Sequence, residues 1–303
     1  MTQIEVTFLG TTAAIPTKDR NHAAIYLRYQ SEQEYTCLLD CGEGTQRQIF
    51  SAGLNFMRIN DIFITHWHAD HFAGLLGLME TMNLEDRTKP LTIFAPEAEK
   101  FVPMLLEIGY STKNFKIIPR NVEFEGTRLE KLVETPEFII AAMPMKHGIP
   151  AAAYAFMEKD RVKIDKIKAK NFGMPATGPV YKKIKSEGIT VFHGKEIKLE
   201  DISISEKGKK VVYSGDTLPN KNMVSLAENA DLLIHDSTFL TEMGAGYKHA
   251  SVDDVMKLAH QTKSKSVVLT HISRRYQDMD EIKEKIKNYP NARIARDFMK
   301  ITI

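Results

Sequence analysis

The sequence predicts an α/β layered fold, and its length corresponds to one large domain or two ordinary ones. Apolar runs of strand length alternate along the chain with segments of helical periodicity, which is the pattern of layered α/β proteins. A chain of 303 residues is long enough to bury a large core. With 43% apolar and 26% charged residues, its composition is ordinary for a globular protein and excludes global disorder.

The predicted strands are short apolar runs bounded by polar or turn-forming residues. They cover residues 4–10, 23–29, 35–40, 61–65, 91–96, 137–143, 210–216, 231–236, 266–271 and 298–303.

Two helices are predicted between these strands. One covers residues 72–84, directly after His71. The other runs from Ser251 to about Thr262, where Ser251 has the position of an N-cap and Asp254 lies three residues further on. Val252, Val255, Met256 and Ala259 then mark one apolar face at helical spacing.

The charge is distributed unevenly. The whole chain carries a net charge of +2, but residues 157–210 hold 14 Lys or Arg against 8 Asp or Glu. That segment therefore carries +6 and the other 249 residues carry −4. A basic segment on an acidic body is expected of an arm that binds a polyanion, although a solvated lysine-rich surface explains the charge run taken alone. Because 171–179 is rich in Gly and Pro, we interpret residues 157–210 as an insertion with its own local structure.

Cysteine content and the N-terminal sequence favour a reducing, cytoplasmic location. Cys37 and Cys41 are the two cysteines, and no second pair accompanies them. This excludes a disulfide scaffold and disfavours a cysteine-based zinc finger. The first residues lack the basic and apolar regions of a signal peptide, and no run of about 18 apolar residues occurs. We expect no contact with a membrane.

The strongest chemical signal is a histidine cluster directly after the predicted strand 61–65. His66, His68, Asp70 and His71 lie within six positions. Imidazole nitrogens and carboxylate oxygens are ligands that Zn²⁺ accepts, and a turn between a strand and a helix brings such side chains together. The sequence therefore predicts a metal site here.

One loop cannot complete one or two metal sites, so further ligands are expected at other strand ends. His147 follows the run 137–143, Asp216 ends the run 210–216, and His271 ends the run 266–271. Each repeats the arrangement of His66, a polar residue where an apolar strand emerges. Any one of them taken alone is as well explained by a structural role as by metal binding.

This set resembles the metallo-β-lactamase superfamily, whose hallmark is His-x-His-x-Asp-His followed by distal His, Asp and His. The resemblance implies a single domain over residues 1–303, an αββα sandwich with two zinc ions. One zinc would be bound by His66, His68 and His147, and the other by Asp70, His71 and His271, with Asp216 bridging them. Two such ions lower the pKa of bound water to about 7 and suit phosphodiester, lactam or thioester hydrolysis. The motif alone does not choose among these substrates.

Further segments resemble the ribonuclease Z family of tRNA 3′-processing endonucleases over nearly the whole chain. They match its Gly-Thr and Pro-x-x-x-Arg-Asn loop, its Asp-Cys-Gly-Glu-Gly-Thr-Gln segment, its His-Glu-Ala-Thr-Phe stretch with Asp236 where Glu is common, its His-Ser/Ala-Ser/Thr motif and its His-x-Ser-x-Arg-Tyr motif. In this chain the segments are Phe8 to Leu27, Thr36 to Gln48, Ile234 to Phe239, Lys248 to Ser251 and His271 to Tyr276.

The same family carries a protruding arm, called the exosite, that grips tRNA away from the cleavage point. Its signature is a Gly-Pro turn followed by a lysine-containing helix. Gly178, Pro179, Lys182 and Lys183 match that signature inside the basic segment 157–210. Lysines on such an arm neutralise phosphates without reading base sequence. The resemblance thus implies precursor tRNA as the substrate and a homodimer as the assembly.

The resemblance also suggests roles for individual residues. Asp70 would orient or deprotonate the attacking water, and His249 would give a proton to the leaving 3′ oxygen. The alternative for His249 is a capping or surface residue before a helix. Arg20, Asn21, Ser273 and Arg275 would contact RNA, with ordinary loop hydrogen bonding as the alternative.

Three functions remain to be distinguished. The leading one is a zinc-dependent endoribonuclease that removes 3′ trailers from precursor tRNA and leaves a 3′-hydroxyl on the tRNA. The second is a hydrolase of small thioesters or lactones with the same fold, which the basic Gly-Pro arm disfavours. The third is a zinc-bearing RNA-binding scaffold without turnover, which the complete set of expected ligands disfavours.

Overall fold

The computed structural model describes residues 2–32, 34–108, 113–243, 246–276 and 278–303. The chain divides into two compact units. The first unit comprises residues 1–135, 139–157 and 210–303, and the second comprises residues 136–138 and 158–209. The predicted insertion, residues 157–210, differs from the second unit by one residue at each end and by the short segment 136–138.

The first unit contains two sheets, each with seven strands among the described residues. In the first sheet the strand order is β18-β1-β2-β3-β4-β5-β6, antiparallel from β18 to β3 and parallel from β3 to β6. Its strands are β1 (Gln3–Gly10), β2 (Ala24–Gln30), β3 (Glu34–Leu39), β4 (Asp61–Phe63), β5 (Leu91–Ala95), β6 (Ile117–Asn121) and β18 (Lys300–Thr302).

The second sheet has the order β17-β16-β15-β14-β9-β8-β7 and is also mixed. Its strands β14 to β17 run parallel, whereas β9 is antiparallel to β14. The members are β7 (Glu130–Glu134), β8 (Phe138–Pro144), β9 (Ala152–Glu158), β14 (Lys210–Tyr213), β15 (Leu232–Asp236), β16 (Val267–Thr270) and β17 (Ala292–Ile294).

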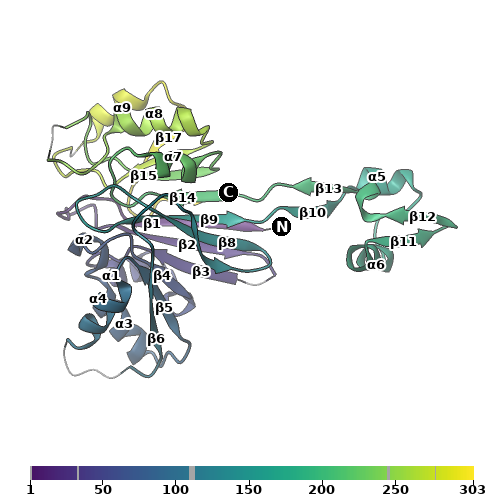
Figure 1. Ribbon diagram of the computed structural model, residues 1–303, viewed down its shortest axis with the longest axis horizontal. Coiled ribbons are helices and arrows are strands. Elements are labelled where there is room, and N and C mark those ends of the chain that lie inside the picture. The colour runs from purple at the N-terminus through teal and green to yellow at the C-terminus, as the bar shows by residue number, and fades with distance from the viewer. Residues whose placement is uncertain (1, 33, 109–112, 244–245, 277) are drawn as a thin grey trace. The chain divides into compact units, whose positions relative to one another are not determined.

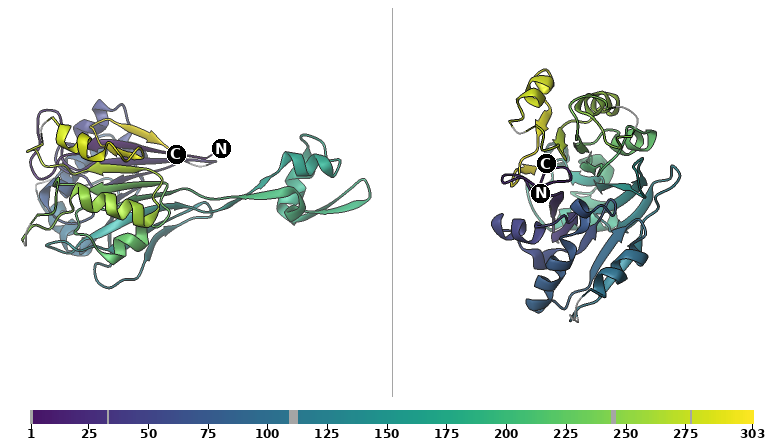
Figure 2. Two further views of the ribbon diagram at one scale, coloured as in Figure 1. Left: turned by 90° about the horizontal axis from the view of Figure 1, so that it is seen from above. Right: turned by 90° about the vertical axis from the view of Figure 1, so that its left-hand side faces the viewer.

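Helices cover the outer face of each sheet, which produces an αββα sandwich. Beside the first sheet lie α1 (Thr45–Ser51), α2 (Ala69–Phe72), α3 (Leu75–Leu84) and α4 (Ala98–Leu106), with a 3₁₀ turn at Phe56–Arg58. Beside the second sheet lie α7 (Lys221–Ala227), α8 (Val252–Thr262) and α9 (Asp280–Ile286). The two groups of helices stand on opposite sides of the strands (Figure 1; Figure 2, right). Among the described residues, no helix combines the length and apolar character that crossing a membrane would require.

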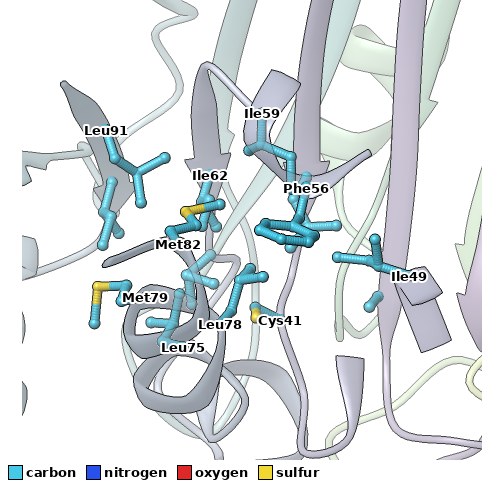
Figure 3. Close-up of a cluster of buried hydrophobic side chains, with 14 of the residues drawn as sticks. Cys41, Ile49, Phe56, Ile59, Ile62, Leu75, Leu78, Met79, Met82 and Leu91 are labelled. Atoms are coloured by element: carbon cyan, nitrogen blue, oxygen red, sulfur yellow. The ribbon is translucent and has the colours of Figure 1, made fainter. Parts of the chain in front are cut away.

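The core under the first sheet explains how the histidine-bearing loop is supported. Apolar side chains from α1, α3 and the strands pack into one buried cluster, of which Figure 3 labels ten members. Leu75, Leu78, Met79 and Met82 form the buried face of α3 at the i, i+3, i+4, i+7 spacing of an amphipathic helix. Because α3 begins three residues after α2 ends, this packing fixes the C-terminal end of the segment that carries Asp70 and His71.

The second unit has a small core of its own. It consists of two antiparallel strand pairs, two short helices and a 3₁₀ turn at Leu199–Ile202. The strand pairs are β10 (Arg161–Ile164) with β13 (Ser203–Glu206) and β11 (Ile189–Phe192) with β12 (Lys195–Lys198), and the helices are α5 (Lys166–Asn171) and α6 (Pro179–Glu187). Ala169, Met174, Ile184, Ile197 and Ile202 are its buried apolar residues. Pro179 opens α6 and Gly188 ends it in the left-handed conformation.

The predicted strands and helices are confirmed, with shifts at their ends. All ten predicted strands are present, and the helix predicted for residues 72–84 is α3, preceded by the single turn α2. In α8 the Ser251 side chain accepts from the Asp254 backbone and the Asp254 side chain accepts from the Ser251 backbone, as the capping box requires. Sequence reasoning missed β6, β7, β9, β17 and the four strands of the second unit.

Arg87 is a buried cation that holds the segment leading into β4. Its side chain is 2% exposed and lies 5.4 Å from the centre of the Phe115 ring. The guanidinium donates to four backbone carbonyls, those of Met57, Ile59, Lys89 and Pro90. These bonds join the approach to β4 with the approach to β5.

We expect Arg87→Lys to lower the free energy of unfolding by about 3 kcal/mol or more, because an ammonium cannot reach all four carbonyls and leaves buried acceptors unpaired. The matched control is Arg58→Lys. Arg58 forms an exposed ion pair with Glu34, and its substitution should cost less than about 1 kcal/mol. Urea denaturation of both variants measures the difference, and equal losses would contradict this role for Arg87.

Candidate metal centre

Three histidines from two loops meet at the first half of the centre. His66 and His68 follow β4, and His147 follows β8 of the other sheet. His66 Nε2 lies 2.9 Å from His68 Nδ1, and His147 Nε2 lies 3.2 Å from the same His68 atom. The sandwich therefore brings together side chains that are up to 81 positions apart in sequence.

Asp70, His71 and His271 form the second half. His71 Nε2 is 3.3 Å from His271 Nε2, and the Asp70 Oδ2 atom is 3.3 Å from His271 Nε2 and 3.6 Å from His71 Nε2. Asp70 and His71 lie on α2, whereas His271 emerges from β16 with a φ of 55°.

Asp216 lies between the two halves. Its Oδ2 atom is 3.6 Å from His66 Nε2 and 3.4 Å from His71 Nε2, and its Oδ1 atom is 3.3 Å from His271 Nδ1. Gly215, just before it, has a φ of 56°, and a Cβ atom there would lie 2.5 Å from Thr65 Cγ2. Only glycine permits this approach of β14 to the end of β4.

These groups fit a pair of metal ions. One nitrogen or oxygen atom from each of His66, His68, His147 and Asp216 lies within 4.8 Å of the others, and the same holds for Asp70, His71 and His271. Asp216 Oδ1 is buried and accepts no hydrogen bond from the residues that the structure describes. Its lone pairs are thus open to a cation. The clusters are consistent with a dinuclear metal site.

Charge supports the same conclusion. Asp40, Asp70, Asp216 and Asp236 lie in or beside the cluster, and three of them are at most 2% exposed. With neutral imidazoles these carboxylates carry a charge of −4, which two divalent cations would neutralise. Burial lowers the pKa of His66, His68 and His147, which keeps these imidazoles in the neutral form that ligates metals.

Asp40, which sequence reasoning missed, orients His71. Its carboxylate accepts a bond from His71 Nδ1 at 2.7 Å, from the Thr65 backbone at 2.7 Å and from the Tyr213 hydroxyl at 2.7 Å. With Nδ1 so engaged, His71 turns Nε2 toward the centre. Burial lowers the pKa of His71, but the charges of Asp216 and Asp40 outweigh it and raise that pKa well above its ordinary value.

His249 and Asp236 form a pair beside the centre. His249 Nδ1 lies 3.1 Å from Asp236 Oδ2 and 3.6 Å from Asp216 Oδ2. Asp236 Oδ1 accepts from the backbone and hydroxyl of Thr238, so this carboxylate is held in place from the opposite side. Burial lowers the pKa of His249, but its hydrogen bond to Asp236 outweighs burial and leaves the pKa raised. Asp236 and His249 also lie within 4.8 Å of Asp216 and His271, but the hydrogen bonds of Asp236 indicate a role as acceptor.

Comparisons with known proteins agree with this geometry. The chain is 37% identical to the ribonuclease Z of Archaeoglobus fulgidus over 99% of its length and 97% of that protein, and 40% identical to the ribonuclease Z of Thermococcus kodakarensis over 99% and 95%. The chain belongs to the ribonuclease Z family.

A solved structure and a family model extend this result. The crystal structure of the short form of human tRNase Z has a TM-score of 0.68 with this chain at 24% identity, covering 98% of both chains, and shares the metallo-β-lactamase fold. A family model described as Anti-Pycsar protein Apyc1 matches residues 4–290, so the chain also belongs to that family.

Four residues of this ribonuclease Z family member are predicted to contact RNA, and each contacts a different group of the protein. Arg20 donates through Nη1 to the Ile272 carbonyl at 2.9 Å, and Asn21 donates through Nδ2 to the Glu43 carbonyl at 2.8 Å. The Arg275 guanidinium lies 5.3 Å from the centre of the Phe239 ring. Ser273 Oγ accepts weakly from the Arg275 backbone at 3.5 Å.

The four predicted exosite residues lie in the second unit. Gly178 precedes α6 with a φ of 151°, and Pro179 is its first residue. Lys182 and Lys183 lie on α6 and are exposed, and Lys183 is 4.0 Å from Glu187.

We expect Asp40→Asn to weaken binding of one of two metal ions by about 10- to 100-fold, because an amide cannot accept from all the donors that surround Asp40. Titration of the metal-free chain with Zn²⁺ in a calorimeter measures this. Tyr213→Phe is the control, since it removes one donor to Asp40 but leaves His71 its acceptor. Equal binding by Asp40→Asn and the wild type would contradict the role of Asp40.

Proposed function

We propose that this chain is a zinc-dependent endoribonuclease that removes the 3′ trailer from precursor tRNA and leaves a 3′-hydroxyl on the tRNA. Membership of the ribonuclease Z family over 99% of the chain carries this proposal. The paired ligand groups on both sides of Asp216 support it, because two metal ions held there would suit the attack of water on a phosphodiester.

We assign His66, His68 and His147 to one zinc ion, Asp70, His71 and His271 to the other, and Asp216 to both. The atoms nearest the centre are His66 Nε2, His68 Nδ1, His147 Nε2, His71 Nε2 and His271 Nε2. When bound, two such ions make water acidic enough to attack at neutral pH and neutralise charge on the phosphate. Zinc suits the nitrogen and oxygen donors, although Mn²⁺, Fe²⁺ or Co²⁺ accept the same set.

Two side chains move protons in this proposal. Asp70 orients the attacking water and accepts its proton, and the Ala14 backbone, at 2.9 Å, fixes the Asp70 Oδ2 atom. His249 holds its Nδ1 proton against Asp236, so Nε2 is the atom that gives a proton to the departing O3′ of the tRNA. The bond between phosphorus and O3′ breaks, and the phosphate stays on the trailer.

The second unit is proposed to bind the body of the tRNA. Lys182 and Lys183 project from α6, and Lys182 has no ion-pair partner in the described part of the chain. Gly178 and Pro179 set the start of that helix. Family resemblance supports a homodimer, and the free thiols of Cys37 and Cys41 favour a cytoplasmic location.

The direct test is cleavage of a precursor tRNA. The zinc-loaded chain should cut a transcript with a 3′ trailer at one position and leave a 3′-hydroxyl on the tRNA. His249→Ala should lower kcat by about 100-fold or more and retain two metal ions per chain by elemental analysis. Rapid hydrolysis of a thioester with no RNA cleavage would favour a small-molecule hydrolase, and tight RNA binding without either reaction would favour a scaffold. Loss of metal from His249→Ala would mean that its role is ligation.

We expect the double variant Lys182→Ala/Lys183→Ala to raise KM for precursor tRNA and to flatten its dependence on salt, because each lost phosphate contact removes about 0.7–0.9 from the logarithmic slope. Hydrolysis of bis(p-nitrophenyl) phosphate should not change. The control is Lys100→Ala/Lys131→Ala, two exposed lysines of the first unit with the same total charge. Equal changes of KM in both double variants would contradict a specific role for the lysines of α6 and would mean that net charge alone determines binding of the precursor tRNA.

A further inference from the structure

We propose that Asp297 is a positioning residue for the metal site formed by Asp70, His71 and His271. It anchors the loop of residues 11–22, and this loop holds both Asp70 and the backbone that follows His271. The inference rests on the proposed ligand set and adds a residue that none of the sequence motifs contains.

Asp297 lies where the chain passes from the second sheet to the first. On one side the Ala295 backbone donates to the Leu269 carbonyl of β16, and on the other the Phe298 backbone donates to the Phe8 carbonyl of β1. The segment is thus tied to both sheets. A side chain that projects from it has a fixed position relative to each.

Three segments of the first half of the chain donate to the Asp297 carboxylate. Thr11 Oγ1 donates to Oδ1 at 2.8 Å. The Asn21 backbone donates to Oδ2 at 2.7 Å, and Gln48 Nε2 donates to the same atom at 3.0 Å. Thr11 and Asn21 are the two ends of the loop, and the Thr11 backbone also donates to the Asn21 carbonyl at 3.0 Å. Asp297 therefore closes the base of the loop.

The loop in turn holds the residue after His271. The Ile272 backbone donates to the Thr11 carbonyl at 3.1 Å, and its carbonyl accepts from Ala13 at 3.3 Å and from Arg20 Nη1 at 2.9 Å. His271 has a φ of 55°, a conformation that a non-glycine residue keeps only when its surroundings impose it. These bonds supply that constraint.

The same loop reaches the other ligand of this half. The Ala14 backbone donates to Asp70 Oδ2 at 2.9 Å, and the Ala14 carbonyl lies 3.2 Å from His22 Nε2. One loop thus contacts the ligand Asp70 and the residue that follows the ligand His271. The guanidinium of Arg20 and the amide of Asn21 serve in this structure to hold the loop, which explains why both bond the protein's own carbonyls.

The loop requires a hydrogen-bonding side chain at position 297 and does not require its negative charge. Burial raises the pKa of Asp297 to about 6, because it outweighs the hydrogen bonds from Asn21 and Thr11 and the positive charge of Arg20. This pKa exceeds that of an unfolded aspartate, so the native state favours the protonated form, and this contribution to stability is lost as pH rises through about 6. An asparagine avoids that loss. Its carbonyl can accept from Asn21 and Gln48, and its amide can donate to the Thr11 hydroxyl, which also accepts.

The test compares Asp297→Ala with Asp297→Asn by calorimetric titration of the metal-free chain with Zn²⁺ at pH 7.5. We expect Asp297→Ala to bind one ion as the wild type does and the other about 10- to 100-fold more weakly. Asp297→Asn should restore both affinities to within about twofold of the wild type. Asp19→Ala is the control, because Asp19 lies in the same loop and its side chain is exposed. Thr11→Val, which keeps the packing volume, should weaken the same ion by about fivefold if Asp297→Ala does not fold.

Several outcomes would overturn the inference. They are wild-type affinity for both ions in Asp297→Ala, equal weakening of both ions, no rescue by asparagine, or a single ion bound by the wild type. Failure of the proposed function is distinguishable, because metal titration needs no RNA. A chain that does not cut precursor tRNA but loses one ion in Asp297→Ala would refute the substrate and support the positioning role.

Discussion

The site depends on one carboxylate that both sheets reach. Asp216 Oδ2 lies 3.6 Å from His66 and 3.4 Å from His71 of the first half of the chain, and Asp216 Oδ1 lies 3.3 Å from His271 of the second half. This requires β14 to approach the end of β4 closely, which Gly215 permits and the hydrogen bond from the Tyr213 hydroxyl to Asp40 holds. If the sheets separated by the width of a side chain, neither ligand group would close. The fold is therefore the condition for the chemistry.

The cluster is costly to fold without cations. Several carboxylates lie close together and away from water. Without metal, protonated imidazoles of the cluster balance part of this negative charge, but metal ligation requires the same imidazoles to be neutral. Bonds from outside the cluster fix each ring. His71 is bonded by Asp40, His147 Nδ1 lies 2.9 Å from the Lys248 carbonyl, and His271 Nδ1 lies 3.0 Å from Thr238 Oγ1. The centre is thus held in position by the protein and neutralised by the metal, so that metal binding and folding stability are coupled.

Most of the fold and the candidate metal ligands could be predicted from the sequence, because both follow from local patterns. Ligands such as His147 and His271 stand where an apolar strand ends, and that pattern is local. The motifs that contain Asp40 and Asp236 assign them no role, because their roles depend on partners that only the tertiary structure supplies. β9 was missed because it is rich in alanine, and β7 because three of its five residues are charged. The surroundings of Arg20 and Asn21 depend on Asp297, 276 positions beyond Asn21, which no pattern in the loop reveals.

The most direct measurement locates the ions. Crystals of the zinc-loaded chain, with anomalous differences recorded on both sides of the zinc absorption edge, show where zinc lies and nothing else. We predict two peaks, one among His66, His68 and His147 and one among Asp70, His71 and His271, with Asp216 in contact with both. A single peak, or a peak held by Asp236 and His249 in place of either group, would contradict it.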